Sequence, residues 1–421
     1  MKKYSHRGME RLGQLLDDIA IKLLTPPETL SLPHTTLDRA IQRAESIARR
    51  LFLIPQLPSD MATVTTSIGT SSRDYSTIAG WEADLDNGGI YSSSDDAVGE
   101  CYNDSVFNES PDIDGGGAIG LSSVTLSVAS GERHDGTEGT GARIVRSDIT
   151  GKILTLSATS SRKTSVEWLE VDANGGRSDP MVSLEGNSQK AELRNCIVHG
   201  SSNGFGNDMQ GIAVAFSGAC ILNTILYDVS LTNTGSVDLQ AIRVNTNIRQ
   251  NDFANITIHG ITKSGSSGGA YGLYLSSDDV DERARNIIST DVTGGAVAAC
   301  FEPASPTNAV MSHNLSSDST ASGTGAVTSV TASGQFVSIV GGSEDLHLKT
   351  GADAIDAGTD LGTTPSGVEI DIDGRDRDTE GDTWDIGAHE FVSGGGAAAT
   401  VGALIGGGLV NSGLVNGGLL G

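Results

Sequence analysis

The sequence predicts an all-β fold built as a solenoid, in which short strands form coils that stack on one another. The composition, with 55 glycines, 10 prolines and many Ser, Thr, Val and Ile residues, is typical of short strands joined by tight turns. Four aligned segments each carry one asparagine, at spacings of 28, 32 and 31 residues: Asn195, Asn223, Asn255 and Asn286. An apolar segment recurs before each asparagine at spacings of 30, 30 and 31 residues: Leu184, Val214, Val244 and Leu275. Two independent sets of equivalent residues, here called columns, therefore repeat with the same period of about 30 residues.

A repeat of about 30 residues is too short to bury an apolar face by itself, so each coil must stack on the next. Equivalent side chains then lie above one another at the strand spacing of about 4.8 Å. An amide side chain both donates and accepts hydrogen bonds, so stacked asparagines can satisfy one another at a bend. We therefore expect Asn195, Asn223, Asn255 and Asn286 to form a structural ladder.

Residues 1–60 form the first of three predicted regions, an amphipathic helical module. Apolar side chains recur at helical spacing in residues 9–24, and again in residues 35–54 after Pro26 and Pro27. Two helices joined by a proline-containing link are typical of an anchoring or oligomerisation module. Alternatively, the helices cover the end of the next domain.

Residues 61–391 are predicted to form the β domain, which opens with one short helix. In "RDYSTIAGWEADL", Ser76 or Thr77 can cap a helix whose apolar face carries Ile78, Trp81 and Leu85. We expect this helix to cover the open first coil, because unpaired backbone groups at the end of a solenoid invite aggregation.

The repeat and the end of this domain together resemble a known family. The segments "EDLHLKTGADAIDAGTDL" (residues 344–361) and "DIDGRDRDTEGDTWDIGAHEF" (residues 371–391) are similar to the segment that closes many bacterial and viral β-helix proteins. Residues 73–391 therefore resemble a right-handed parallel β-helix of the pectin-lyase-like superfamily, as found in phage and bacterial surface proteins. The resemblance implies coils of three sheets with inward-facing asparagine and aliphatic ladders.

Residues 392–421 form the third predicted region, an uncharged tail rich in Gly and Leu. One leucine recurs every five residues, a period that fits neither a heptad nor an α-helix: Leu404, Leu409, Leu414 and Leu419. One interpretation is a tail that associates with itself or binds a partner, and the other is a flexible low-complexity segment. Asn411, Ser412 and Asn416 interrupt the run and argue against a membrane span.

The charge and the cysteines exclude several classes of function. The formal net charge of −26 should repel nucleic acids and anionic membranes. The cysteines are far apart and form neither a disulfide framework nor a zinc-binding motif: Cys101, Cys196, Cys220 and Cys300. Charged residues interrupt the first apolar stretch, so the sequence predicts no signal peptide and synthesis in the cytoplasm of a host.

A candidate site is the column formed by the fourth residue after each asparagine, which contains His199, Tyr227 and His259. The first and third residues after each asparagine are mostly apolar, so alternation along the strand predicts that this column faces outward. Outward His and Tyr side chains could line a glycan-binding groove, or serve as the base and acid of a lyase. The alternative is an ordinary solvated strand face.

Two acidic segments are candidates for a catalytic or a metal site. Asp278, Asp279, Asp281 and Glu282 could supply the two carboxylates of a glycoside hydrolase, but no companion motif lies on a neighbouring coil, which favours an acidic turn. "DIDGRDRDTEGD" does not fit the EF-hand pattern, although its carboxylates, such as Asp376, Asp378 and Asp382, could bind Ca²⁺ in another geometry. We therefore assign no catalytic, cofactor-binding or metal-binding residue.

These patterns favour a non-enzymatic structural protein of a virion, such as a phage surface fibre, a spike or a capsid decoration protein. Residues 1–60 and the tail would contact other virion proteins, and the protein is expected to be a homo-oligomer. The alternative is a polysaccharide lyase or hydrolase, such as a tailspike depolymerase, or an adhesin that binds a host glycan.

Overall fold

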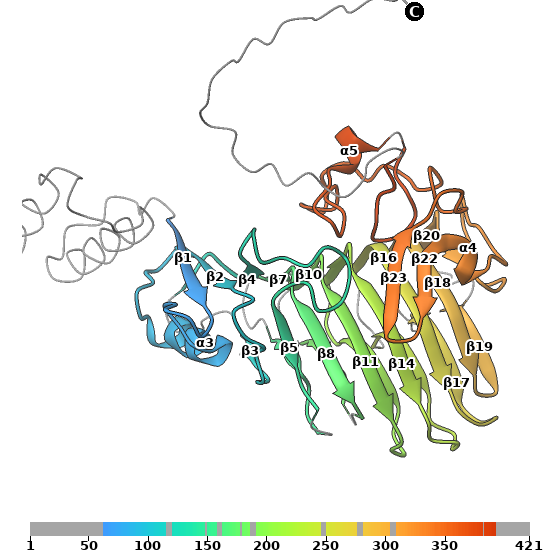
Figure 1. The fold of residues 1–421 in the computed structure, drawn as a ribbon, viewed down its shortest axis with the longest axis horizontal. Coiled ribbons are helices and arrows are strands. Elements are labelled where there is room, and N and C mark those ends of the chain that lie inside the picture. The colour runs from blue at the N-terminus through green and yellow to red at the C-terminus, as the bar shows by residue number, and fades with distance from the viewer. Residues whose placement is uncertain are drawn as a thin grey trace, which may run out of the picture.

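The computed structural model describes residues 62–392, apart from residues 115–119, 148–149, 158–161, 177–178, 186–190, 246–249, 276–280, 304–308 and 382. The described chain forms a parallel β-solenoid of stacked coils, as the sequence predicted (Figure 1). The predicted helical module and residues 393–421 of the predicted tail lie outside the described residues. No helix among the described residues is long and apolar enough to cross a membrane.

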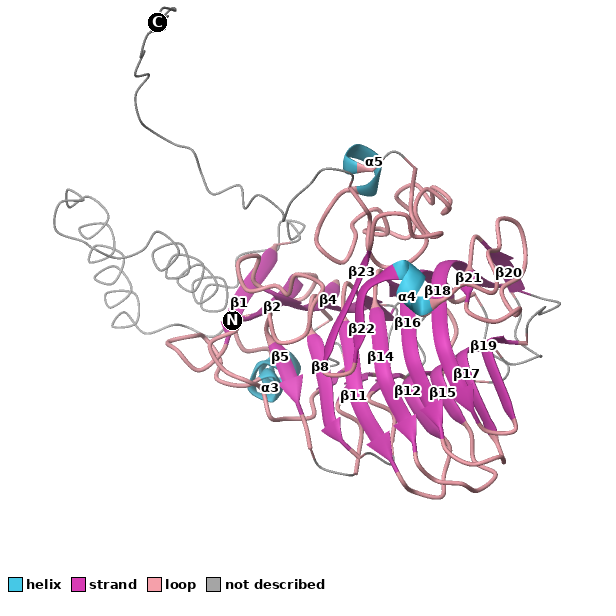
Figure 2. Ribbon diagram, turned by 45° about the vertical axis from the view of Figure 1, so that its right-hand side comes forward, coloured by secondary structure: helices cyan, strands magenta, loops and turns pink. Residues whose placement is uncertain are grey.

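One side of the solenoid is a parallel sheet of seven strands, here called sheet B (Figure 2). Successive strands of this sheet come from successive coils, so each strand pairs with the equivalent strand about one repeat later. The strands of sheet B are β3 (Asp112–Ile113), β6 (Leu154–Leu156), β9 (Val182–Leu184), β12 (Met209–Val214), β15 (Leu239–Val244), β17 (Gly269–Tyr274) and β19 (Val297–Glu302).

The other two sides form one sheet of 14 strands, here called sheet A, which has two arms. The first arm contains β1 (Thr63–Ile68), β2 (Asp96–Cys101), β4 (Ser123–Val128), β7 (Lys163–Glu167), β10 (Ala191–Arg194) and β13 (Cys220–Leu222). The second arm contains β5 (Arg143–Val145), β8 (Glu170–Gly175), β11 (Ile197–Asn203) and β14 (Ile225–Leu231). The long strands β16 (Asp252–Lys263) and β18 (Glu282–Gly294) run through both arms, and the short strands β20 (Ala309–Ser312) and β21 (Leu315–Ser316) pair with β18.

The interior of the coils is apolar and continuous from one coil to the next. Cys196 and Val198, the first and third residues after Asn195, belong to this core, together with Leu184 of sheet B. The equivalent residues Ile256 and Ile258 lie in the same cluster. The alternation seen in the sequence therefore gave the correct inward positions.

A short helix, α3 (Ile78–Asn87), packs at the N-terminal end of the solenoid. Thr77 caps it by accepting a hydrogen bond from the backbone amide of Gly80 at 3.0 Å. The ring of Trp81 is buried and lies so close to Gly99 of β2 that a Cβ atom at residue 99 would be 2.6 Å from it. The predicted capping helix thus sits against the first coils of the domain.

Residues 332–391, here called the closing segment, leave the solenoid and pack against its outer surface (Figures 1 and 2). The segment contains α4 (Ala332–Gln335), an antiparallel hairpin of β22 (Phe336–Val340) and β23 (Ser343–Leu348), and α5 (Arg377–Glu380). Its apolar side chains, including Phe336 and Ile386, form one cluster with Ile197, Ile225 and Ile288. The outward side chains at the start of β11 and β14, Ile197 and Ile225, are therefore covered, whereas Ser202 and Thr262 farther along the same face stay exposed.

Candidate functional site

The Asn ladder, which consists of Asn195, Asn223, Asn255 and Asn286, lies at the bend between the two arms of sheet A. All four residues have left-handed backbone conformations, with φ between 48° and 55°. Among residues other than glycine, asparagine tolerates this conformation well, because its short polar side chain bonds locally. Trp168, which occupies the same position one coil earlier, also has a positive φ of 63°. The backbone bend therefore explains the recurrence of asparagine.

The ladder side chains face the closing segment, which corrects the expectation of an inward-facing ladder. Their Nδ2 atoms donate to backbone carbonyls of Asp371 (2.6 Å), Gly367 (2.9 Å), Val368 (2.8 Å) and Thr359 (2.9 Å), in ladder order. Asn255 also donates to Asn223 at 2.9 Å, and Asn286 donates to Asn255 at 3.0 Å. The ladder therefore both links neighbouring coils and holds the closing segment against the solenoid.

The predicted column of His199, Tyr227 and His259 is present in adjacent register on β11, β14 and β16. The rings of His199 and Tyr227 stack with their centroids 4.9 Å apart and their planes 2° apart. All three side chains point away from the interior of the coils, but the residues are only 6%, 4% and 6% exposed. The closing segment therefore covers this column, which in the described residues lies neither along an open groove nor on a solvated strand face, the two settings that the sequence left open.

Two glutamates surround His199, and the sequence alone did not identify either of them. The Nε2 atom of His199 lies 3.0 Å from the carboxylate of Glu170, which is fully buried, and its Nδ1 atom lies 3.5 Å from Glu138. The hydroxyl of Tyr227 donates to Glu138 at 2.9 Å. Strand pairing places Glu170 between Arg143 and Ile197, and this charged residue beside the aliphatic Ile197 and Ile225 of the next two coils was the available signal.

The neighbouring carboxylates shift the pKa values of His199 and Tyr227. Burial alone would lower the pKa of His199, but the hydrogen bond and the charge of Glu170 raise it above its usual value. Burial and the neighbouring Glu138 carboxylate raise the pKa of the Tyr227 phenol. Both ring nitrogens of His199 therefore face carboxylates, and the Tyr227 hydroxyl donates to one of them, so these polar groups are paired within the chain.

His259 has different surroundings in the same column. Its Nδ1 atom lies 3.0 Å from the hydroxyl of Thr290, and its ring packs edge-on against Phe336 of the closing segment. Burial lowers the pKa of His259. The three predicted residues are thus neighbours, but they do not share one polar centre.

His347, Asp373 and His389 of the closing segment have potential metal-ligand atoms within 4.8 Å of one another. His347 is paired through both nitrogens, with Asp345 at 2.5 Å and Asp373 at 2.9 Å. The Nδ1 atom of His389 accepts a hydrogen bond from the amide of Leu348 at 3.1 Å, which uses the one lone pair of a neutral imidazole, and its Nε2 atom lies 2.9 Å from Arg375 and 3.6 Å from Asp373. Neither imidazole therefore offers a lone pair for a metal ion.

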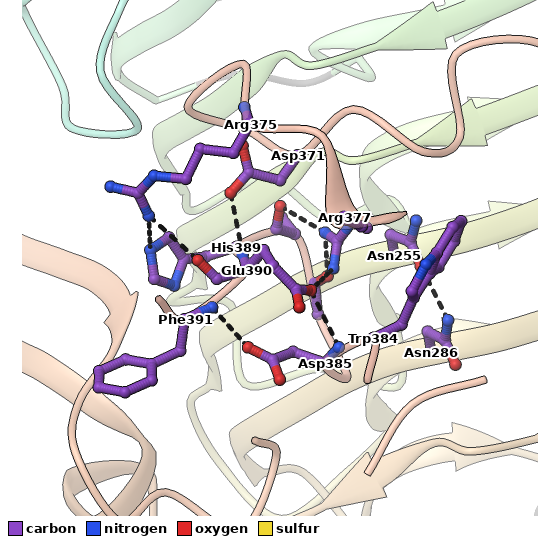
Figure 3. Close-up of polar contacts among 12 residues, drawn as sticks. Asn255, Asn286, Asp371, Arg375, Arg377, Trp384, Asp385, His389, Glu390 and Phe391 are labelled. Atoms are coloured by element: carbon purple, nitrogen blue, oxygen red, sulfur yellow. Dashed lines mark hydrogen bonds and ion pairs between the residues drawn. The ribbon is translucent and has the colours of Figure 1, made fainter. Parts of the chain in front are cut away.

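The acidic residues of the closing segment accept hydrogen bonds from the segment itself (Figure 3). Asp371 accepts from the backbone amides of Asp373, Arg375 and Glu390. Asp376 caps α5 by accepting from the amide of Asp378, whose own carboxylate accepts from the Trp384 indole at 2.8 Å. These carboxylates are used as structural acceptors, and Asp382 lies outside the described residues.

The acidic turn considered as a hydrolase site is only partly described. Asp278 and Asp279 lie outside the described residues. Glu282 is buried and accepts a hydrogen bond from the backbone amide of Asn251 at 3.2 Å. Its position is that of a structural acceptor between coils.

The comparisons with known proteins add no further evidence about the function. A scan of the chain against protein-family models finds no match, and neither curated proteins nor solved structures give one.

Proposed function

We propose that this protein is a non-enzymatic structural component of a virion, such as a phage surface fibre, a spike or a capsid decoration protein. Its β-solenoid would be a parallel β-helix of the pectin-lyase-like superfamily, in line with the sequence resemblance of residues 73–391. Residues 1–60 and the tail would join it to other virion proteins or to further copies of itself. These attachments rest on the sequence patterns of the two regions.

The burial of the His199, Tyr227 and His259 column carries the non-enzymatic part of this proposal. A polysaccharide lyase or hydrolase needs acid and base groups that a long substrate can reach. The closing segment covers this column, and the surrounding carboxylates are paired within the chain. This arrangement favours a rigid scaffold over a catalytic groove.

Purified particles from the culture that produces this chain would test the proposal directly. Mass spectrometry should detect the chain in the particles, and cryo-electron microscopy should show a β-solenoid of matching size on their surface. Absence of the chain from such particles would overturn the virion assignment. Release of unsaturated or reducing sugars from host polysaccharides by the purified protein would overturn its non-enzymatic part.

A further inference from the structure

The strand β22 of the closing segment has an unpaired edge and exposed apolar side chains. It pairs with β23, and its other edge pairs with no strand among the described residues. Val337 and Val340 are 56% and 65% exposed, although Phe336 of the same strand is buried. None of the five residues of β22 is charged or a proline. Exposed edge strands normally carry charges or proline as protection against pairing, so β22 is suited to accept a further strand.

The described chain ends beside this hairpin. The ring of Phe391 packs against the apolar cluster that contains Phe336 of β22 and Leu348 of β23. The Nδ1 atom of His389 accepts a hydrogen bond from the backbone amide of Leu348 at 3.1 Å. Residues 393–421 of the tail therefore begin next to the hairpin. Ten residues of chain span up to about 33 Å at about 3.3 Å each, so the apolar part of the tail can reach β22.

The composition of the tail matches what such an edge accepts. Residues 393–421 contain no charged residue, although the whole chain has a net charge of −26. Glu344 and Asp345 of β23 would repel an acidic segment, but they do not repel an uncharged one. Two units of the tail, "GLVNS" and "GLVNG", place a Leu-Val pair between Gly and Asn. Strand addition needs only backbone groups and alternate apolar side chains, both of which these units supply.

We infer that the tail docks on the hairpin of its own chain. Residues 408–417 add an extended segment to the unpaired edge of β22, and their Leu and Val side chains cover Val337 and Val340. The covalent connection favours this occupant over a separate molecule, because a tethered segment has an effective concentration in the millimolar range. The inference adds a docking place for the tail to the structural role proposed above. Its test uses the purified chain without particles, so either proposal can fail alone.

Limited proteolysis of the purified full chain with elastase, followed by intact-mass measurement, tests the docking. Val337→Lys combined with Val340→Lys places two charges against the apolar tail. Cleavage within residues 393–421 should then become about tenfold faster than in the parent chain, because a protease attacks the released segment. Val310→Lys is the matched control, because Val310 of β20 is also 56% exposed and lies outside the closing segment. This control should leave the cleavage rate unchanged.

Hydrogen exchange gives a second reading, from the tail. Leu409→Asp combined with Leu414→Asp removes apolar side chains from the docked segment without touching the hairpin. The backbone amides of β22 should then exchange faster than in the parent chain. All these variants should keep the melting temperature of the parent chain, because Val337, Val340 and Val310 are exposed and the two leucines lie in the tail.

Several results would overturn the inference. The tail is cleaved equally fast in the parent chain and in the double-lysine variant, Val310→Lys has the same effect as that variant, or β22 exchanges at the same rate in the double-aspartate variant. Light scattering separates a docked tail from a contact between copies. The double-lysine variant should keep the molar mass of the parent chain, and a lower mass would assign β22 to a contact between copies instead.

Discussion

The guanidinium of Arg377 lies 2.8 Å from the carboxylate of Glu390, and both side chains are buried (Figure 3). Arg377 also donates to the backbone carbonyls of Gly387 and Ala388, at 2.9 and 2.8 Å. This single side chain therefore joins α5 to the end of the closing segment. Because the closing segment packs over Tyr227 and His259, we expect this ion pair to keep the His199 column buried as well.

Replacing Arg377 with Met should release the closing segment. The substitution leaves the Glu390 carboxylate and two carbonyls buried without a cation, a loss of about 3–5 kcal/mol for a pair of this kind. Urea denaturation followed by Trp fluorescence, together with hydrogen exchange of residues 371–391, would measure the effect. Arg283→Met is the matched control, because Arg283 is half-exposed in its ion pair with Asp252. This substitution should lower the free energy of unfolding by less than about 1 kcal/mol. Equal costs for the two variants would contradict the prediction.

Asn255 should tolerate glycine better than aspartate. Asn255→Gly loses the hydrogen bonds to Asn223 and Val368, but glycine adopts the left-handed backbone readily. Asn255→Asp keeps the size of the side chain but places a carboxylate oxygen against the side-chain oxygen of Asn223 and the backbone oxygen of Val368. We expect Asp to cost at least about 2 kcal/mol more than Gly in the free energy of unfolding. Protease cleavage within residues 359–371 should increase in the same order. An aspartate variant as stable as the glycine variant would show that the ladder bonds contribute little.

The period of the sequence was enough to predict the coils, the register and the bend, because these depend on contacts between equivalent residues of neighbouring repeats. The direction of the Asn ladder was not predictable in this way. The left-handed residue at each bend interrupts the two-residue alternation, and the partners of Asn195 and Asn223 lie more than 140 residues away, in a segment that does not repeat.

The covering of the candidate site escaped prediction for the same reason. Alternation placed His199 and Tyr227 on the outward side, but no repeat indicates that Phe336 packs over that side. Arg377 lies in a run of charges that is typical of solvated loops, and only its pairing with Glu390 explains its burial. The sequence repeat of a solenoid therefore does not predict which side chains are buried by a segment outside the repeat.

The His347 network should make the stability of the closing segment depend on pH. Burial by itself would lower the pKa of His347, but hydrogen bonds with Asp345 and Asp373 raise it to about 10, above the usual 6.5. The stabilisation is therefore complete below pH 6.5 and is lost as the pH rises toward 10. His347→Gln should cost roughly 2 kcal/mol at pH 6 and much less at pH 10, relative to the parent chain. A cost of His347→Gln that stays constant between pH 6 and pH 10 would contradict the assignment.

Gly99→Ala should destabilise the protein, and the loss of stability should depend on the presence of Trp81. An added Cβ at residue 99 would lie 2.6 Å from the Trp81 ring, so Gly99→Ala must displace α3 from the first coils, at about 1–3 kcal/mol. Gly131→Ala is the control, because a Cβ there meets no atom within 4 Å, and its stability should be unchanged or slightly increased. Combining Gly99→Ala with Trp81→Leu should cost less than the sum of the two single changes, since the smaller side chain removes the clash. If the losses in unfolding free energy of the two single variants simply add up in the double variant, the contact between Trp81 and residue 99 is not the cause of the loss.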